Sequence, residues 1–478
     1  MNAAAPDPRR WQALALVCVA FFMTVLDVSI VNVALPSIKT SLHVSDVTVQ
    51  WVLIAYTITF GGFLLLGGRA GDLLGRRRMF MVGMLLFSAA SLVCGLAGSI
   101  GVLIAARAVQ GLGAAIVSPA TLAIITTTFE EGAERNKALG IWGAMGGSGA
   151  AAGVLFGGIL TKYLGWEWIF FVNVPVGAIV LALTRPIVRE SRAQGVRGFD
   201  AGGAVTVTGG LALLVYAISK APDDGWANGR TIGLLIGSAV LLLAFLAIEA
   251  RHRQPLVPFR IFRTKTLAGA NVAGFLLGAV IFANFFILTL YVQQVLGYSA
   301  LKTGLTFLAT AGTTIPVAGA AQALVTRIGV RPVLTVGLAL IAAAMFFYAQ
   351  IPVSGSYAGD LLPGYLMMGF GLAFSFIPVS IAALAGVEHH ESGLASGLLN
   401  TSQQIGGALG VAIAATVAFT HERTLLASGH SVPQAMTSGF ALSFWVLGGL
   451  GVAGVLAALL LVRSGEAPVE AQSSPGLA

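Results

Sequence analysis

Fourteen long apolar runs dominate this chain and restrict the folds open to it. An α-helix rises 1.5 Å per residue, so about 20 apolar residues cross the roughly 30 Å hydrocarbon core of a bilayer. The runs fall at residues 11–36, 48–68, 79–99, 101–128, 137–160, 168–188, 202–220, 230–250, 266–292, 303–326, 331–351, 359–386, 393–420 and 437–463. Only 10% of the residues are charged, against about 25% in soluble proteins. The pattern predicts an all-α membrane protein.

The distribution of basic residues predicts the orientation of these spans. If the N-terminus lies inside, 20 of the 27 Lys and Arg fall in cytoplasmic segments, 6 fall in external segments, and Arg107 lies within a span. Because basic residues accumulate in cytoplasmic loops, both termini are predicted to be cytoplasmic, in a plasma membrane. Topology therefore accounts for the formal charge of +8, and we expect no nucleic-acid partner.

The two ends of the chain resemble each other. A basic Gly/Arg turn follows the second span at 68–78, and a weaker one follows the tenth at 326–332. Without spans seven and eight, these turns are equivalent positions in two six-span halves, an arrangement typical of transporters with a midplane substrate site. The predicted units are an N-terminal bundle at 1–190, a linker with two additional helices at 191–258, a C-terminal bundle at 259–463 and a disordered cytoplasmic tail at 464–478.

A carboxylate within the first span, Asp27 in LDVSIVNVALP, is the sharpest functional signal. A charge at the bilayer centre costs several kcal/mol, so an ionisable residue there is a functional hypothesis by default. Its predicted partner is Arg107. Asp27 lies about 14 Å, and Arg107 about 9 Å, from the outer ends of their spans, a difference that an Arg side chain can bridge. The alternatives are an Asp held by structural hydrogen bonds and a purely structural ion pair.

Glycines recur every four residues in the fifth span, at Gly149, Gly153 and Gly157, with Gly158 beside the last. Small residues at this spacing let the backbone of a neighbouring helix approach closely. The pattern is compatible both with static helix packing and with a moving hinge.

Polar side chains within the spans are candidate substrate contacts. Asn400, Gln403 and Gln404 share one face of span thirteen, and Asn284 lies in span nine at a depth close to that of Asp27. Such groups face protein or a water-filled cavity, so hydrogen bonding between helices is the alternative. The full predicted set is Asn32, Tyr56, Gln110, Asn284, Asn400, Gln403 and Gln404.

Several other functions are disfavoured. The segment GYSALKT at 297–303 lacks the second Gly of a phosphate-binding loop, so ATP is not the expected energy source. The EHHE segment at Glu388–Glu391 is better interpreted as a polar loop than as a metal site. No nucleophile triad or metal cluster lies at one depth, and no filter-like segment repeats. We therefore expect neither an enzyme nor a channel, and no metal or other cofactor.

These motifs together resemble the major facilitator superfamily, and within it the fourteen-helix drug:proton antiporters, from about residue 11 to 463. LDVSIVNVALP is similar to a first-helix motif whose Asp is implicated in proton coupling, and LIAARAVQGLGAA is similar to a fourth-helix motif. GRAGDLLGRRR matches the cytoplasmic gate motif, and GAAAGVLFGG resembles the antiporter motif of helix five. The resemblance assigns proton coupling to Asp27 and Arg107, the cytoplasmic gate to Gly68, Asp72, Gly75, Arg76 and Arg77, and antiporter-specific helix packing to Gly149, Gly153, Gly157 and Gly158.

Three positions depart from the family pattern. Leu73 stands where a basic residue is common, Val154 where the antiporter motif usually has Pro, and Glu167 where this branch often has Arg. The implied fold has two six-helix bundles plus two additional central helices.

The implied function is export of drugs, antibiotics or other amphipathic small molecules by alternating access, driven by the proton-motive force. A dedicated exporter of one metabolite or lipid, and an uptake symporter, stay open, as does the oligomeric state.

Overall fold

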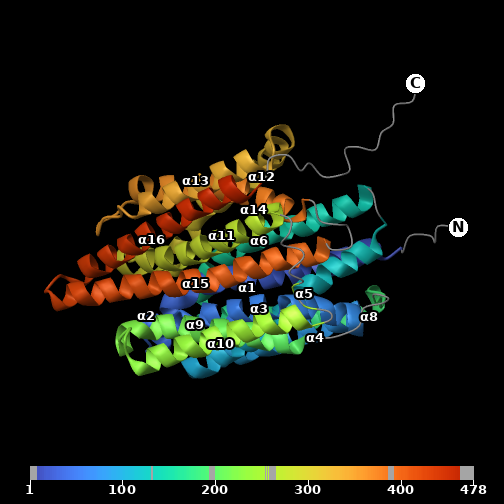
Figure 1. Ribbon diagram of the computed structural model, residues 1–478, viewed down its shortest axis with the longest axis horizontal. Coiled ribbons are helices and arrows are strands. Elements are labelled where there is room, and N and C mark those ends of the chain that lie inside the picture. The colour runs from blue at the N-terminus through green and yellow to red at the C-terminus, as the bar shows by residue number, and fades with distance from the viewer. Residues whose placement is uncertain are drawn as a thin grey trace.

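The protein is a bundle of long helices that run nearly side by side, as this computed structural model shows (Figure 1). The structure describes residues 8–130, 133–192, 200–252, 255, 257, 265–385 and 392–462. No β-strand occurs within these ranges. The Glu388–Glu391 loop and the 464–478 tail of the sequence analysis lie outside the described residues.

The helices follow the apolar runs closely. The first half contains α1 (Arg10–Leu42), α2 (Asp46–Val49), α3 (Trp51–Leu74), α4 (Arg76–Gly95), α5 (Ile100–Thr128), α6 (Ala133–Tyr163), α7 (Trp168–Phe171) and α8 (Asn173–Ile187). The additional pair is α9 (Ala201–Asp224) and α10 (Gly229–Arg251). The second half contains α11 (Lys265–Leu290), η2 (Tyr291–Val295), α12 (Ala300–Ile328), α13 (Val330–Tyr348), η3 (Tyr357–Leu361), α14 (Leu362–Leu384), α15 (Ser392–Ala427) and α16 (Val432–Leu461).

Thirteen helical segments of the described chain are long and apolar enough to cross a membrane. The helix α6, with 31 residues, runs along α1 and α12 and takes the place of the predicted fifth span. The thirteen segments and α6 together are the fourteen long helices that the apolar runs predict. The all-α membrane fold is therefore confirmed, and the chain is a multi-pass membrane protein.

The two Gly/Arg turns have the same backbone geometry in both halves. Gly75, between α3 and α4, has a φ of 113°, and Gly329, between α12 and α13, has a φ of 87°. Residues with a Cβ rarely adopt this left-handed region, so glycine lets one helix end and the next begin almost at once. This geometry supports the internal repeat that the sequence indicates.

Two pairs of helices join the halves. The helix α6 packs on α12, and α3 packs on α15, so each half contributes two helices to the seam. The additional helix α9 packs on both α3 and α15, and α10 packs on the outer side of α9 (Figure 1). The additional pair thus covers one side of the seam between the halves.

The seam between α6 and α12 is closed at one end and open at the other. We call the end at which α1 begins at Arg10 and α4 begins at Arg76 the basic end. Six of the eight buried residues of α12 lie between 300 and 310, and only Ala321 and Val325 are buried between 311 and 328. The halves therefore separate toward the basic end.

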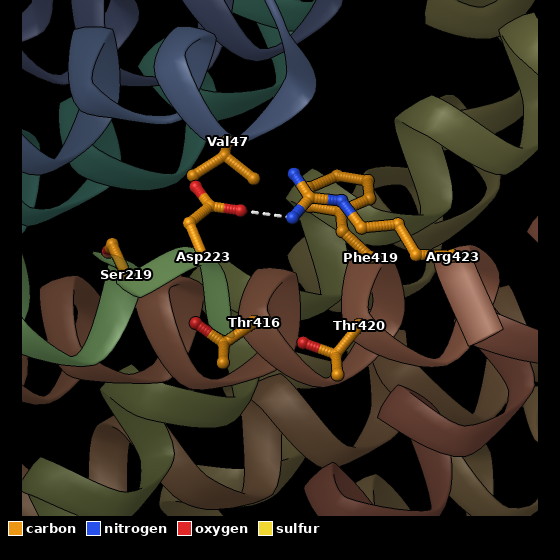
Figure 2. Close-up of a pocket in the computed structure, with 7 residues that line it drawn as sticks. All are labelled: Val47, Ser219, Asp223, Thr416, Phe419, Thr420 and Arg423. Carbon is orange, nitrogen blue, oxygen red and sulfur yellow. Dashed lines mark hydrogen bonds and ion pairs between the residues drawn. The ribbon is translucent and has the colours of Figure 1, made fainter. Parts of the chain in front are cut away.

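At the opposite end, polar contacts hold the halves together. Gln293 Nε2 donates to the Val33 carbonyl oxygen at 2.9 Å, and Gln294 Nε2 donates to Asp46 Oδ1 at 3.1 Å. Figure 2 shows the neighbouring junction, where Asp223 of α9 pairs with Arg423 of α15. These contacts close the end of the molecule that is predicted to face outward.

Candidate functional site

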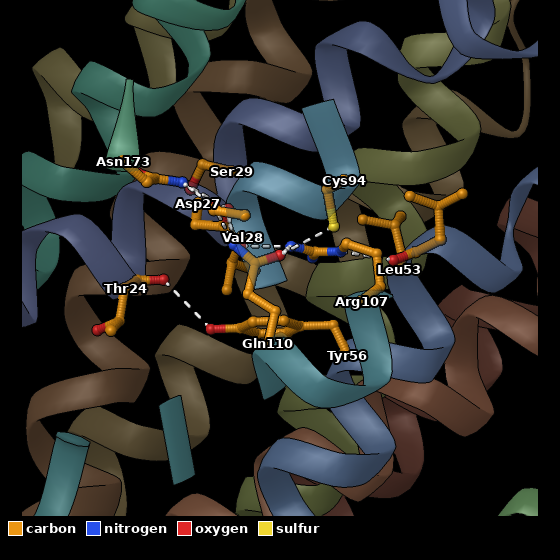
Figure 3. A network of polar contacts seen from close by, with 12 residues as sticks. Thr24, Asp27, Val28, Ser29, Leu53, Tyr56, Cys94, Arg107, Gln110 and Asn173 are labelled. Carbon is orange, nitrogen blue, oxygen red and sulfur yellow. Dashed lines mark hydrogen bonds and ion pairs between the residues drawn. The ribbon is translucent and has the colours of Figure 1, made fainter. Parts of the chain in front are cut away.

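Asp27 lies at the centre of a polar network inside the first half (Figure 3). Its side chain and that of Arg107 are both completely buried. Asp27 Oδ2 accepts a hydrogen bond from Arg107 Nη1 at 2.5 Å. The depth argument predicted this contact between α1 and α5, and the structure contains it.

The second carboxylate oxygen of Asp27 is also fully engaged. Oδ1 accepts from Gln110 Nε2 at 2.8 Å and from Asn173 Nδ2 at 3.1 Å. Three donors from α5 and α8 therefore surround one carboxylate.

Arg107 is held from several sides. Its Nε donates to the Val52 carbonyl oxygen at 3.0 Å and its Nη1 to Gln110 Oε1 at 2.7 Å. The guanidinium carbon lies 4.2 Å from the centre of the Tyr56 ring, a cation–π distance. Its Nη2 has no hydrogen-bond partner among the described residues. Arg107 therefore keeps contacts to α3 even if Asp27 is neutralised.

Two members of the network escaped the sequence analysis. Asn173 Nδ2 donates to Ser91 Oγ at 3.0 Å, and Gln110 Nε2 donates to the same oxygen at 2.7 Å. Asn173 stands alone in an apolar run, at the start of α8, and this isolation was a usable signal. Ser91 is an ordinary small residue of α4, and nothing in its sequence context marks it.

The predicted substrate contacts divide into two groups. Tyr56 and Gln110 belong to the Asp27 network and are completely buried, rather than facing a cavity between the halves. Asn32 and Asn284 are also buried, and each has a side-chain oxygen without a hydrogen-bond partner among the described residues. Such an oxygen can accept a hydrogen bond from a ligand or a water molecule.

The stripe on α15 lies at the seam. A Cβ added to Gly61 of α3 would lie 2.9 Å from Gln404 Cβ, so the two halves touch there. Gln403 is half-buried and its Nε2 has no partner among the described residues, and Asn400 is half-buried as well. The structure therefore places this stripe between the halves or close beside them.

The glycine ridge of α6 packs directly on the turns of α1 that carry Asp27. A Cβ at Gly149 would lie 3.1 Å from the Phe22 carbonyl oxygen, one at Gly153 would lie 2.6 Å from that of Leu26, and one at Gly157 would lie 2.8 Å from that of Ile30. Such spacings leave no room for side chains.

Gly158 belongs to a different contact. A Cβ there would lie 2.7 Å from Leu301 Cα, on α12 of the other half. The helix α6 is therefore packed tightly against α1 on one face and against α12 on another. It connects the segment around Asp27 with the seam.

The predicted gate loop is built within the first half. Arg76 pairs with Asp72 at 2.9 Å, and the carboxylate of Glu190 accepts from the backbone N–H groups of Arg77 at 3.0 Å and Arg78 at 3.2 Å. Gly75 leaves space for that carboxylate, because a Cβ there would lie 2.7 Å from it.

Glu190, which the sequence analysis did not single out, thus caps the start of α4. A Cβ added to the remaining gate glycine, Gly68, would lie 3.4 Å from Pro119 Cβ, an ordinary contact distance. The contacts of Arg76, Arg77 and Arg78 with Asp72 and Glu190 lie within the first half, which agrees with the separation of the halves at the basic end.

Comparison with known proteins decides the family. The family model described as Major Facilitator Superfamily matches residues 17–411. The chain belongs to the major facilitator superfamily. Members of this superfamily are transporters, so the protein is a transporter rather than an enzyme.

Among the superfamily relatives, the chain is 38% identical to the puromycin resistance protein of Streptomyces alboniger, over 98% of this chain and 95% of that protein. It is also 38% identical to the cephamycin export protein of Amycolatopsis lactamdurans, over 85% of this chain and 84% of that protein. A crystal structure of an auto-inhibited peptide transporter superposes with a TM-score of 0.69 at 18% identity, covering 96% of this chain and 99% of that one. This superfamily fold agrees with the fourteen long helices.

Proposed function

We propose that this transporter exports amphipathic antibiotics or similar small molecules from the cytoplasm across the plasma membrane, driven by inward proton movement. The observation that carries the proposal is the buried Asp27 network, a single carboxylate engaged by Arg107, Gln110 and Asn173. The named relatives confer resistance to, or export, antibiotics. The distribution of basic residues supports a cytoplasmic position for both termini.

Proton binding at Asp27 would act through helix packing. A neutral Asp27 no longer attracts Arg107, so the contact between α1 and α5 weakens, while Arg107 stays on α3 through Val52 and Tyr56. Because α1 is packed against the glycine ridge of α6, and α6 against α12, a shift of α1 reaches the seam between the halves. Protonation and substrate binding would thus favour opposite orientations.

The proposed driving force is the proton-motive force, with no cofactor. One elementary charge moving across the membrane provides about 2.3 kcal/mol per 100 mV, and a pH difference adds to this. ATP hydrolysis and metal chemistry are not required. A dedicated exporter of one metabolite or lipid is the second candidate, because the network around Asp27 sets the coupling and not the substrate.

The decisive experiment uses Asp27→Asn in proteoliposomes with an imposed pH gradient. The substitution keeps size and hydrogen bonding but cannot release a proton, so substrate-dependent proton flux and uphill transport should both be lost. Asp360→Asn, which removes a half-buried carboxylate at the opposite end, is the matched control and should transport normally. Uphill transport by Asp27→Asn would place the coupling elsewhere.

Substrate range is tested in an efflux-deficient bacterium that expresses the chain. The panel contains puromycin, a cephamycin, tetracenomycin C and lincomycin, the compounds in the names of relatives. Resistance to several unrelated members would support a multidrug exporter. Resistance to one alone would favour the dedicated exporter.

A further inference from the structure

An arginine-lined cavity lies at the basic end, away from the Asp27 network. An open cavity of about 320 Å³ is bounded by the start of α1, the start of α4 and the end of α8. Its lining consists of Pro8, Arg9, Arg77, Arg185, Pro186, Ile187, Val188 and Arg189. Four of these eight residues are arginines, and none of the eight is acidic.

Two of the arginines are held in place by the end of α8. Arg9 Nη1 donates to the Pro186 carbonyl oxygen at 2.5 Å, and Arg77 Nη1 donates to that of Val188 at 3.3 Å. Carbonyl oxygens orient a guanidinium group without neutralising its charge. The nearby Glu190 carboxylate accepts from the backbone of α4 and pairs with Arg77 and Arg78. The cavity therefore suits an anion.

The chemistry of arginine narrows the class of anion. The guanidinium group is planar and presents five donors, which match the oxygens of a phosphate in paired hydrogen bonds. A volume of about 320 Å³ exceeds what a single inorganic phosphate fills, but it accommodates a phosphate with its glycerol substituents. A phosphodiester is thus a better fit than a small inorganic ion.

The surface next to the cavity is apolar and exposed. On α8, Ile179 is 59% exposed and Leu183 is 43% exposed, and on α4, Val82 is 44% exposed and Leu85 is 58% exposed. Leu183 lies four residues before the lining residue Ile187, on the same face of the helix and about 6 Å along it. These side chains extend from the cavity into the predicted hydrocarbon region, where acyl chains would cover them.

We propose that this cavity binds the phosphate of an anionic phospholipid of the inner leaflet, with its acyl chains along α4 and α8. Basic pockets between helices on the cytoplasmic side are suited to such headgroups. The lipid would join the start of α1, the gate loop and the end of α8. The inference is independent of the proton-coupling role proposed for Asp27.

The test measures lipid retention on the purified full-length chain. Native mass spectrometry compares phosphatidylglycerol with phosphatidylcholine at equal concentration, for the wild type and for Arg185→Gln/Arg189→Gln. Arg327→Gln/Arg331→Gln, at the basic end of the second half, is the matched control. Each surface arginine contributes about 1 kcal/mol to anionic lipid binding, so the cavity variant, which lacks two of them, should bind phosphatidylglycerol roughly thirtyfold more weakly. The wild type and the control should keep their preference.

Further arms keep the proposal falsifiable if the cavity variant folds poorly. A photoactivatable phosphatidylglycerol should label the wild-type chain within residues 76–85 and 179–192. Labelling spread evenly over the basic end would overturn the proposal, as would equal retention by the cavity variant. Inorganic phosphate at millimolar concentration should leave lipid retention unchanged. Full displacement by inorganic phosphate would show that the site takes free phosphate instead of a lipid.

Discussion

At the scale of single residues, three side chains determine the surroundings of the buried Asp27 carboxylate. Arg107 supplies the counter-charge, whereas Gln110 and Asn173 supply neutral donors to the other oxygen. Hydrogen bonds to a charged group contribute about 1.5–3 kcal/mol, so the loss of either neutral donor should have a measurable effect. Asn173 is the most informative of these donors because it comes from α8, a helix otherwise outside the predicted site.

We predict that Asn173→Ala changes the pH dependence of transport. The Asp27 carboxylate, the proposed proton-binding group, loses a hydrogen-bond donor at 3.1 Å. Transport at neutral pH should fall by about tenfold, as expected for the loss of about 1.5 kcal/mol. The measurement is substrate efflux from proteoliposomes over a range of pH values.

The control for this residue is Asn271→Ala on α11. Asn271 is also buried, donates to the Leu267 carbonyl oxygen at 2.9 Å and accepts from Ser402, but it lies far from Asp27 in the other half. It should leave the pH profile unchanged. A normal pH profile for Asn173→Ala would limit Asn173 to a packing role.

Among the elements, α6 has the most demanding packing. Its ridge of Gly149, Gly153 and Gly157 lies against the α1 backbone on both sides of Asp27, and Gly158 lies against α12. Contacts this close transmit a displacement of one helix to the next, because the packed interior is dense and deforms little. The presence of Val154 in place of the usual Pro does not prevent this packing, and the Val154 carbonyl oxygen itself faces Gly304 of α12.

We predict that Gly153→Ala already impairs transport and that Gly153→Leu abolishes it. A Cβ at this position would lie 2.6 Å from the Leu26 carbonyl oxygen and 2.8 Å from Ser29 Cβ, so α6 must move away from α1. Overpacking of this kind costs about 1–3 kcal/mol, which a thermal unfolding assay detects. Gly319→Ala on α12, where a Cβ would meet nothing within 4 Å, is the matched control. Wild-type behaviour of both alanine variants would remove the ridge from the mechanism.

For the whole molecule, the two ends differ in charge and in closure. The halves touch at the opposite end through Gln293 and Gln294, and few residues of α12 are buried toward the basic end. If the basic end faces the cytoplasm, as the positive-inside rule predicts, the conformation is open inward and a substrate would enter from the cell. The additional helix α9 contacts both halves, so it must slide on α3 or α15 when the transporter reverses.

We predict that Trp226→Cys is labelled from outside intact cells, whereas Arg327→Cys is labelled only after the membrane is opened. Trp226 is 58% exposed between α9 and α10 at the opposite end, and Arg327 is exposed at the basic end. The native residues Cys18 and Cys94 are buried and should add little background. The reverse labelling pattern would invert the proposed orientation.

We predict that a short bis-thiol crosslinker between Asp46→Cys and Gln294→Cys arrests transport. The native side chains are 3.1 Å apart across the seam, so the link prevents the outward opening that substrate release requires. Lys39→Cys with Asp46→Cys is the control, because that ion pair lies entirely within the first half. Unimpaired transport by the crosslinked seam pair would mean that this end does not open.

The sequence by itself determined the number of long helices and the contact between Asp27 and Arg107, and it predicts the internal repeat. These properties depend on local pattern: the length of an apolar run, a glycine at a turn, and the depth of a charge counted along its own span. The spacing of Gly149, Gly153 and Gly157 likewise predicts a close helix contact, since residues four apart share one face.

The tertiary structure decided which faces meet. Helices that are apolar all round carry little periodic signal, so their rotation about the axis cannot be predicted from residue order. For this reason the hydrogen-bond partners of Asn173, Ser91 and Glu190 could not be predicted from the sequence. The sequence also did not indicate that the glycine ridge packs on α1. Tyr56 and Gln110, which were predicted to contact substrate, lie against the ion pair of Asp27 and Arg107. A polar side chain within a span can face either a cavity or a neighbouring helix, and only the packing of the helices determines which.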